Sequence, residues 1–373
     1  MKFIRHLIDV TSIMQLSKSQ RRIVFYSEGK EYWVHLEGLL KEFLNLSNVP
    51  ACYISSGEDD PGLFYRHPNL KSFKIDEGGF RDWLFKNIDA DVMVMTMPDL
   101  DQYQVKRSKK PVHYVYVQHS LVSLHMVYRK GAFDKYDTIF CAGPHHIKEV
   151  RAIEKKYNLP PKKLVEHGYG RIDSIIDSIE KSTEKTTSDP PKILIAPSWG
   201  ENALIESIGE KVVLHLLETG FRVTLRPHPR TVKFAKDKLN SIFQQHEHNP
   251  NFSYEINVAS QKSLHQSDLM ISDWSGAALD YAFGLGKPVL FIDVPRKINN
   301  QEYESINIDP FEVWIRNKIG RVQRLEDLES LNRSVYDLLS SKTCFDQKSL
   351  AEKNIFNLGN SSRIGAAHLM KII

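Results

Sequence analysis

A strand–turn–helix pattern in the second half of the chain carries side chains suited to binding phosphate. Its sequence is Ser272-Asp-Trp-Ser-Gly-Ala-Ala-Leu-Asp-Tyr281. Asp273 and Ser275 fall where the predicted strand ends and a helix begins, so Ser275 and the backbone N–H groups of Gly276 and Ala277 could receive a phosphate. Asp280 could accept hydrogen bonds from a bound ribose or polyol. The alternatives are that Asp273 or Ser275 only caps the helix and that Asp280 is a solvated helix residue.

Arg226-Pro-His-Pro-Arg230 follows a second predicted strand in the same half. The prolines restrict the local backbone, and the end of a parallel strand is where α/β proteins bind ligands. Flanked by Arg226 and Arg230, His228 could donate a hydrogen bond to a phosphoryl oxygen or to a leaving group. The alternative is a loop histidine between two solvated arginines.

In the first half, Gln118-His-Ser120 ends an apolar strand. Imidazole titrates near neutral pH, so His119 is the candidate general base that takes a proton from an acceptor hydroxyl. The alternative is a histidine that caps the strand or forms hydrogen bonds within the core.

Metal and cofactor motifs are weak or missing in this sequence. Asp89 and Asp91, like Asp99 and Asp101, resemble metal-holding aspartate pairs, but they bracket strands or turns where Asp is common. The adjacent residues His145-His146 do not share a helix face, so a metal between them is not expected. There is no GxxxxGK[ST], HExxH or GxSxG element. We therefore expect no metal ion and no cofactor.

Apolar strand-like runs alternate with helical patterns in both halves of the chain, which predicts parallel sheets covered on both faces. The predicted strands are Arg22–Tyr26, Asp91–Met95, His113–Val117, Thr138–Cys141, Lys192–Ala196, Arg222–Leu225, Leu269–Ser272 and Pro288–Ile292. The polar, proline-ended segment Glu180–Pro191 is the best linker candidate. We expect α/β domains at 1–182 and 190–350, with 351–373 packing back on the first, and a ligand cleft at the strand ends.

Composition fits a cytoplasmic protein acting on an anionic substrate. The chain has 373 residues, a formal charge of +4, and no apolar run long enough to span a membrane. This mild charge does not imply nucleic-acid binding, and three scattered cysteines do not form a disulfide framework. Residues 1–16 have the spacing of an amphipathic helix, which could lie on a membrane surface or, as the stronger alternative, pack on the body of the protein.

Five blocks, in order, resemble the CDP-glycerol glycerophosphotransferase family of bacterial surface-polymer enzymes. They are Gln118-His-Ser120, Ala142-Gly-Pro144, Gly168-Tyr-Gly-Arg-Ile-Asp173, Arg226-Pro-His-Pro229, and Ser272–Tyr281 with Gly286-Lys-Pro-Val-Leu-Phe291. Two departures stand out: Gly276 replaces the family's second serine, and Gln118-His-Ser120 lacks its usual glycine.

The resemblance implies a GT-B fold of two Rossmann-like, doubly wound domains with an interdomain cleft. It implies a CDP-activated donor in the C-terminal domain, transfer of a polyol phosphate to a glycan or polyol-phosphate acceptor that could be lipid-linked, and release of CMP. It assigns catalysis to His119 and His228 and phosphate binding to Ser275. A GT-B glycosyltransferase or a 2-epimerase using a nucleotide sugar is the alternative, and peripheral contact with the inner face of the cell membrane is a further expectation.

Overall fold

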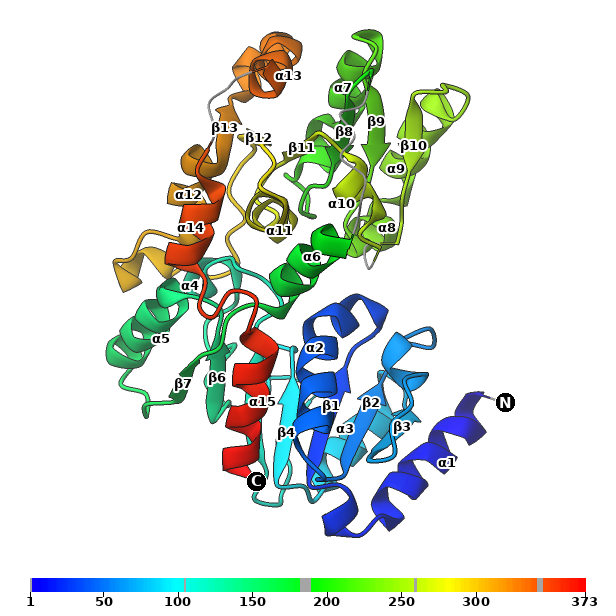
Figure 1. Ribbon diagram of the computed structural model, residues 1–373, viewed down its shortest axis with the longest axis vertical. Coiled ribbons are helices and arrows are strands. Elements are labelled where there is room, and N and C mark those ends of the chain that lie inside the picture. Colours follow the sequence, from blue (N-terminus) through cyan, green and yellow to red (C-terminus); the bar gives the residue numbers. More distant parts are fainter. Residues whose placement is uncertain (1, 104, 182–188, 258–259, 341–344) are drawn as a thin grey trace. The chain divides into compact units, whose positions relative to one another are not determined.

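The computed structural model describes residues 2–103, 105–181, 189–257, 260–340 and 345–373. It divides into two compact units (Figure 1). Unit 1 comprises residues 1–174, 299–308 and 354–373, and unit 2 comprises residues 175–298 and 309–353. Most of the predicted linker, residues 182–188, lies outside the described residues.

Unit 1 is built on a seven-stranded parallel sheet in the order β3-β2-β1-β4-β5-β6-β7. Its strands are β1 Ile23–Ser27, β2 Ala51–Ser55, β3 Leu70–Lys74, β4 Val92–Met95, β5 His113–Val117, β6 Thr138–Cys141 and β7 Lys163–Glu166. The strand order reverses between β1 and β4, as in doubly wound folds. Crevices at such reversals, beyond the carboxyl ends of the strands, commonly bind ligands.

Helices cover both faces of this sheet because successive strand residues point to opposite sides and both sets are apolar. Val92, Val94 and Val115 pack in one cluster with α2 and α15, while Met93 and Met95 pack in another with α1 and α3. The helices assigned to unit 1 are α1 Lys2–Gln15, α2 Lys30–Leu46, α3 Gly79–Asn87, α4 Leu124–Val127, α5 Pro144–Tyr157 and α15 Ser361–Ile372, with 3-10 turns η1 Lys18–Gln20, η2 Pro61–Leu63 and η3 Tyr303–Ile306. Helix α6, Gly170–Lys181, begins in unit 1 and continues into unit 2.

The C-terminal helix α15 lies along α2 in unit 1 (Figure 1). Two glycines allow this close approach, since a Cβ on Gly365 would lie 2.6 Å from the Leu39 side chain and one on Gly38 would collide with Ser362. Asp173 fixes the start of α15 by accepting hydrogen bonds from the backbone N–H groups of Gly359 (2.7 Å) and Ser361 (2.9 Å). The last 20 residues are therefore an integral part of this unit.

Unit 2 is built on a six-stranded parallel sheet in the order β10-β9-β8-β11-β12-β13, which reverses between β8 and β11. Its strands are β8 Lys192–Ile195, β9 Arg222–Leu225, β10 Phe252–Tyr254, β11 Leu269–Ser272, β12 Val289–Ile292 and β13 Gly320–Gln323. Its helices are α7 Leu204–Glu218, α8 Pro229–Phe234, α9 Lys236–His246, α10 Lys262–Gln266, α11 Gly276–Leu285, α12 Phe311–Ile319, α13 Leu331–Ser340 and α14 Gln347–Asn354, with the 3-10 turn η4 Leu325–Ser330. The predicted α/β class with two parallel, doubly wound sheets is thus confirmed.

Candidate functional site

His119 follows β5 in unit 1 and is half-buried among aromatic rings. Its Nδ1 lies 2.9 Å from the Tyr116 hydroxyl and its Nε2 lies 3.3 Å from the Tyr128 hydroxyl. Tyr32 contacts the ring edge-on, with ring centroids 5.8 Å apart, and the Tyr169 hydroxyl donates to the His119 backbone carbonyl. These contacts fix both the ring and the backbone that carries it.

The surroundings of His119 keep its imidazole neutral. Burial lowers its pKa from 6.5 to about 4, because a charged ring would lose its hydration. The neutral form is the one that a general base requires, but a base with so low a pKa is weak. An anionic group bound nearby would raise this pKa and so strengthen the base.

The residue before the histidine is unusual for its position. Gln118 is only 2% exposed, and among the described residues neither its amide nitrogen nor its amide oxygen has a hydrogen-bond partner. A buried amide without partners costs free energy. The sequence predicted that Gln118 lies at the end of a strand, but it did not predict that the side chain is buried.

In unit 2, the predicted phosphate-binding segment lies at the reversal of strand order, beyond β11. Ser275 caps α11, and its Oγ accepts a hydrogen bond from the Ala277 N–H at 3.3 Å. Gly276 and Ala277 form the partly exposed first turn of the helix, whereas Asp280 is buried in its second turn. The capping interaction expected as an alternative is therefore present, and it leaves the helix N-terminus at the edge where ligands bind.

Asp273 holds the loop that follows the neighbouring strand β8. Its carboxylate accepts hydrogen bonds from the backbone N–H groups of Ser198 at 2.7 Å and Leu204 at 3.0 Å. Because Asp273 is almost completely buried, these bonds tie the loop between β8 and α7 firmly to the end of β11. The carboxylate thereby positions Trp199, the residue next to Ser198.

The Arg226–Arg230 segment follows β9, and its two arginines lie in different environments. Arg226 is buried and donates to the Ser263 hydroxyl at 3.3 Å, whereas Arg230 is exposed at the start of α8. His228 caps that helix, with its Nδ1 accepting a hydrogen bond from the Arg230 N–H at 3.1 Å. In a neutral ring, this bond places the proton on Nε2, which is the arrangement needed to donate to an oxygen.

Trp199 connects these two segments, and the sequence reasoning did not identify it. Its indole ring lies 6.1 Å from the His228 ring and 4.6 Å from the Arg230 guanidinium carbon. The Lys297 ammonium, from the loop after β12, lies 4.2 Å from the same ring centre. We call Trp199, His228, Arg230 and Lys297 the indole cluster. The available signal for Trp199 was an aromatic residue in the loop after the strand Lys192–Ile195, four positions beyond Ile195. Nothing near Lys297 in the sequence marks that residue.

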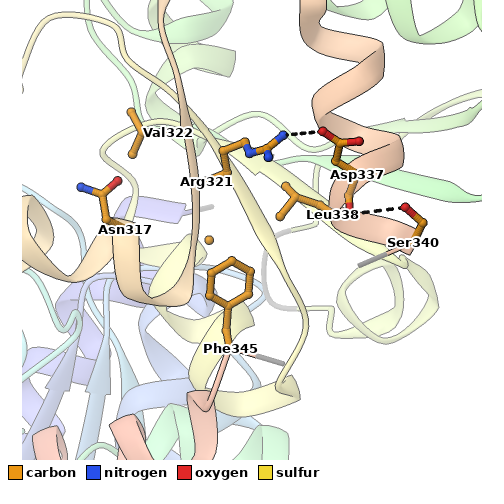
Figure 2. A pocket seen from close by; sticks show the side chains of 8 residues that line it. Asn317, Arg321, Val322, Asp337, Leu338, Ser340 and Phe345 are labelled. Atoms are coloured by element: carbon orange, nitrogen blue, oxygen red, sulfur yellow. Dashed lines mark hydrogen bonds and ion pairs between the residues drawn. The ribbon is translucent and has the colours of Figure 1, made fainter. Parts of the chain in front are cut away.

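The structure thus brings His228 and Arg230 to the same end of one sheet as Asp273 and Ser275. A hollow of about 640 Å³ lies elsewhere in unit 2, at the amino end of β13 (Figure 2). Arg321 lines it and pairs with Asp337 at 3.0 Å. None of the predicted site residues lines this hollow, so the strand ends remain the better candidate site.

Within the described residues, no group of three or more His, Cys, Asp or Glu side chains is arranged to hold a metal ion. Lys297 and Arg230 provide positive charge at the indole cluster.

Comparisons with known proteins agree with this description. Residues 129–304 match the family described as CDP-glycerol:poly(glycerophosphate) glycerophosphotransferase, and this range contains four of the five blocks noted in the sequence. A search of curated proteins finds no match.

Similar folds occur among solved structures. The wall teichoic acid polymerase TagF is 13% identical with a TM-score of 0.59, and the alignment covers 100% of this chain and 98% of that chain. The UDP-GlcNAc 2-epimerase from Neisseria meningitidis, bound to UDP-GlcNAc, is 14% identical with a TM-score of 0.58, covering 94% of this chain and 100% of that chain. The epimerase from Methanocaldococcus jannaschii is 13% identical with a TM-score of 0.55, covering 94% and 98%. The predicted resemblance is confirmed over residues 129–304, which match the CDP-glycerol:poly(glycerophosphate) glycerophosphotransferase family.

Proposed function

We propose that this protein transfers a polyol phosphate, glycerol phosphate or a close analogue, from a CDP-activated donor to a glycan or polyol-phosphate acceptor, and releases CMP. The family match over residues 129–304 carries the proposal. The arrangement in unit 2 supports it, since a helix N-terminus, an N-capping histidine and two exposed or half-buried cations gather at one end of a parallel sheet.

In the proposed reaction, the donor diphosphate lies at Ser275 and the first turn of α11. An acceptor hydroxyl oxygen attacks the β-phosphorus, the bond from that phosphorus to the oxygen of CMP breaks, and CMP leaves with the electron pair. His119 takes the acceptor's proton. His228 and Arg230 stabilise the charge on the phosphoryl and leaving oxygens, which is the main task of a protein in phosphoryl transfer.

In this scheme the bound anionic donor raises the low pKa of His119, which makes the imidazole a stronger base. Arg226, which is buried against Ser263, is better suited to holding the loop than to contacting the donor.

Donor identity is tested by measuring nucleotide release from CDP-glycerol, CDP-ribitol and a panel of UDP-, GDP- and CMP-sugars. We expect CMP from a CDP-alcohol in the presence of a glycerophosphate polymer. Turnover of a nucleotide sugar alone would overturn the proposal in favour of the glycosyltransferase or epimerase alternative.

The catalytic roles are tested with His119→Ala and His228→Ala. Loss of a general acid or base costs on the order of 10² to 10⁴ in rate, so each variant should nearly stop CMP release while staying folded by circular dichroism. Ser120→Ala, next to His119, serves as a matched control that should keep most of the activity. A histidine variant that releases CMP at the parent rate does not have the assigned role.

We further propose that α1 contacts an anionic membrane surface at which a lipid-linked acceptor would be presented. Val10 and Ile13 of this helix pack on the sheet, but Ile4, Leu7 and Ile8 are 60%, 45% and 57% exposed beside Arg5. No described helix is long and apolar enough to cross a bilayer. The protein should sediment with phosphatidylglycerol vesicles but not with phosphatidylcholine vesicles, and Ile4→Ser with Ile8→Ser should abolish this. Equal sedimentation of parent and variant would refute the contact.

A further inference from the structure

The Lys297 ammonium in unit 2 is a cation without an anionic partner in the part of the chain that the structure describes. It comes from the loop after β12 and lies over the Trp199 indole, 4.2 Å from the ring centre. Among the described residues, this ammonium makes no hydrogen bond and no ion pair. A half-buried lysine ordinarily recovers its lost hydration through such contacts.

The two carboxylates that attract the Lys297 ammonium already accept hydrogen bonds from other groups. Asp273 accepts from the Ser198 and Leu204 N–H groups. Glu206 accepts from the Thr231 hydroxyl at 2.9 Å. Both attract Lys297 electrostatically, but neither pairs with it.

Arg230 adds a second positive charge at the same ring. Its guanidinium carbon lies 4.6 Å from the Trp199 ring centre, and its charge acts against that of Lys297. Two cations held on one indole, beside the ring of His228, favour binding of a group with more than one negative charge. A diphosphate has this character.

We propose that Lys297 and Arg230 together bind the diphosphate of the nucleotide donor and that both are held in place by the Trp199 ring. This inference rests on the proposed function and adds Lys297 and Trp199 to the residues that position the donor. The Nε2 atom of His228 would then lie next to the phosphoryl group that is transferred.

A pH dependence follows from this assignment. Burial, with repulsion from Arg230, lowers the pKa of Lys297 to about 8, although Asp273 and Glu206 act in the opposite direction. Only the protonated ammonium attracts phosphate, so affinity for the donor should fall as the pH rises through 8. A bound diphosphate should raise this pKa by favouring the charged form.

The test is equilibrium binding of CDP by calorimetry between pH 6.5 and 9.5, with no acceptor and no turnover. Lys297→Met should weaken CDP binding about 10- to 100-fold at pH 7, the range expected for one charge-assisted hydrogen bond. Lys297→Arg should keep the affinity and lose the fall above pH 8, because a guanidinium stays protonated. Cytidine, which lacks phosphate, should bind the parent and Lys297→Met alike.

Arg296→Met is the matched control, since Arg296 neighbours Lys297 in sequence but lies over Trp274 instead. It should leave CDP affinity nearly unchanged, and thermal unfolding should verify that all variants fold. Unchanged CDP binding in Lys297→Met, an equal loss in Arg296→Met, or an alkaline fall that persists in Lys297→Arg would overturn the inference. If the CDP results hold but CDP-glycerol is not turned over, the diphosphate site stands and only the proposed reaction fails.

Discussion

His167 shows at the residue scale how a buried imidazole couples stability to pH. It is stacked on Phe140 with ring centroids 4.7 Å apart, its Nδ1 donates to the Gly168 carbonyl, and its Nε2 has no hydrogen-bond partner within the ranges that the structure describes. Burial lowers its pKa from 6.5 to about 4. The folded protein therefore resists the proton that the unfolded chain accepts below pH 6.5.

From this shift we predict a loss of stability in acid. Above pH 6.5 the His167 ring is neutral in both states and adds no pH dependence. As the pH falls from 6.5 to 4, the unfolded state is favoured, by up to about 3 kcal/mol from this residue. In urea unfolding at several pH values, the free energy of unfolding of His167→Gln should fall less steeply toward acid than that of the parent, whatever the stability of the variant at pH 7. Parallel declines would show that His167 does not titrate as described.

Residue types and strand ends were enough to select His119 and His228, because polar side chains after buried parallel strands lie at the ligand-binding edge. The same reasoning could not select Lys297. Its place depends on a loop of unpredictable path that brings it over Trp199, about 100 positions earlier in the sequence. Nor could sequence alone show that Arg226 is buried while Arg230 is exposed.

At the element scale, every strand that was predicted lies inside its sheet, between two other strands. β11, Leu269–Ser272, is fully buried, and its apolar sequence is unambiguous. The strands that were not predicted include the four at the sheet edges, β3, β7, β10 and β13. Edge strands are partly exposed and carry polar residues, as in the Leu-Lys-Ser-Phe-Lys sequence of β3, so hydrophobic pattern does not reveal them. β2 was also missed, although all five of its residues, Ala-Cys-Tyr-Ile-Ser, are buried.

Close packing of α15 on α2 gives a prediction at the same scale. A methyl group on Gly365 would lie 2.6 Å from both the Leu39 side chain and the His167 ring, whereas one on Gly79, at the exposed start of α3, would meet nothing within 4 Å. Gly365→Ala should lower the free energy of unfolding by about 1 to 3 kcal/mol through overpacking. Gly79→Ala should be neutral or slightly stabilising, since alanine favours helix. Urea denaturation compares the two, and equal stability would mean that the helices separate at little cost.

At the scale of the whole molecule, the chain passes between the two units four times, after residues 174, 298, 308 and 353. The two core clusters described above nevertheless draw all their residues from unit 1, and a third cluster, which includes Ile193, Leu225 and Leu269, draws all of its residues from unit 2. Stability is therefore expected to reside in each unit separately, although neither is one continuous stretch of sequence.

Removal of residues 354–373 tests this organisation. The truncation takes Ala366 and Leu369 from the core of unit 1 and leaves the buried Asp173 carboxylate without the N–H groups of Gly359 and Ser361. Loss of apolar burial together with a buried charge that has lost partners is strongly destabilising. Hydrogen exchange should show that β1, β2 and β4 lose protection, while β8, β11 and β12 keep theirs.

Asp173→Asn, which keeps the helix but weakens its anchor, should give a smaller loss of protection confined to the same strands. Equal loss in both sheets would show that the units fold as one cooperative body, and retained protection in β1 would show that α15 contributes little to unit 1.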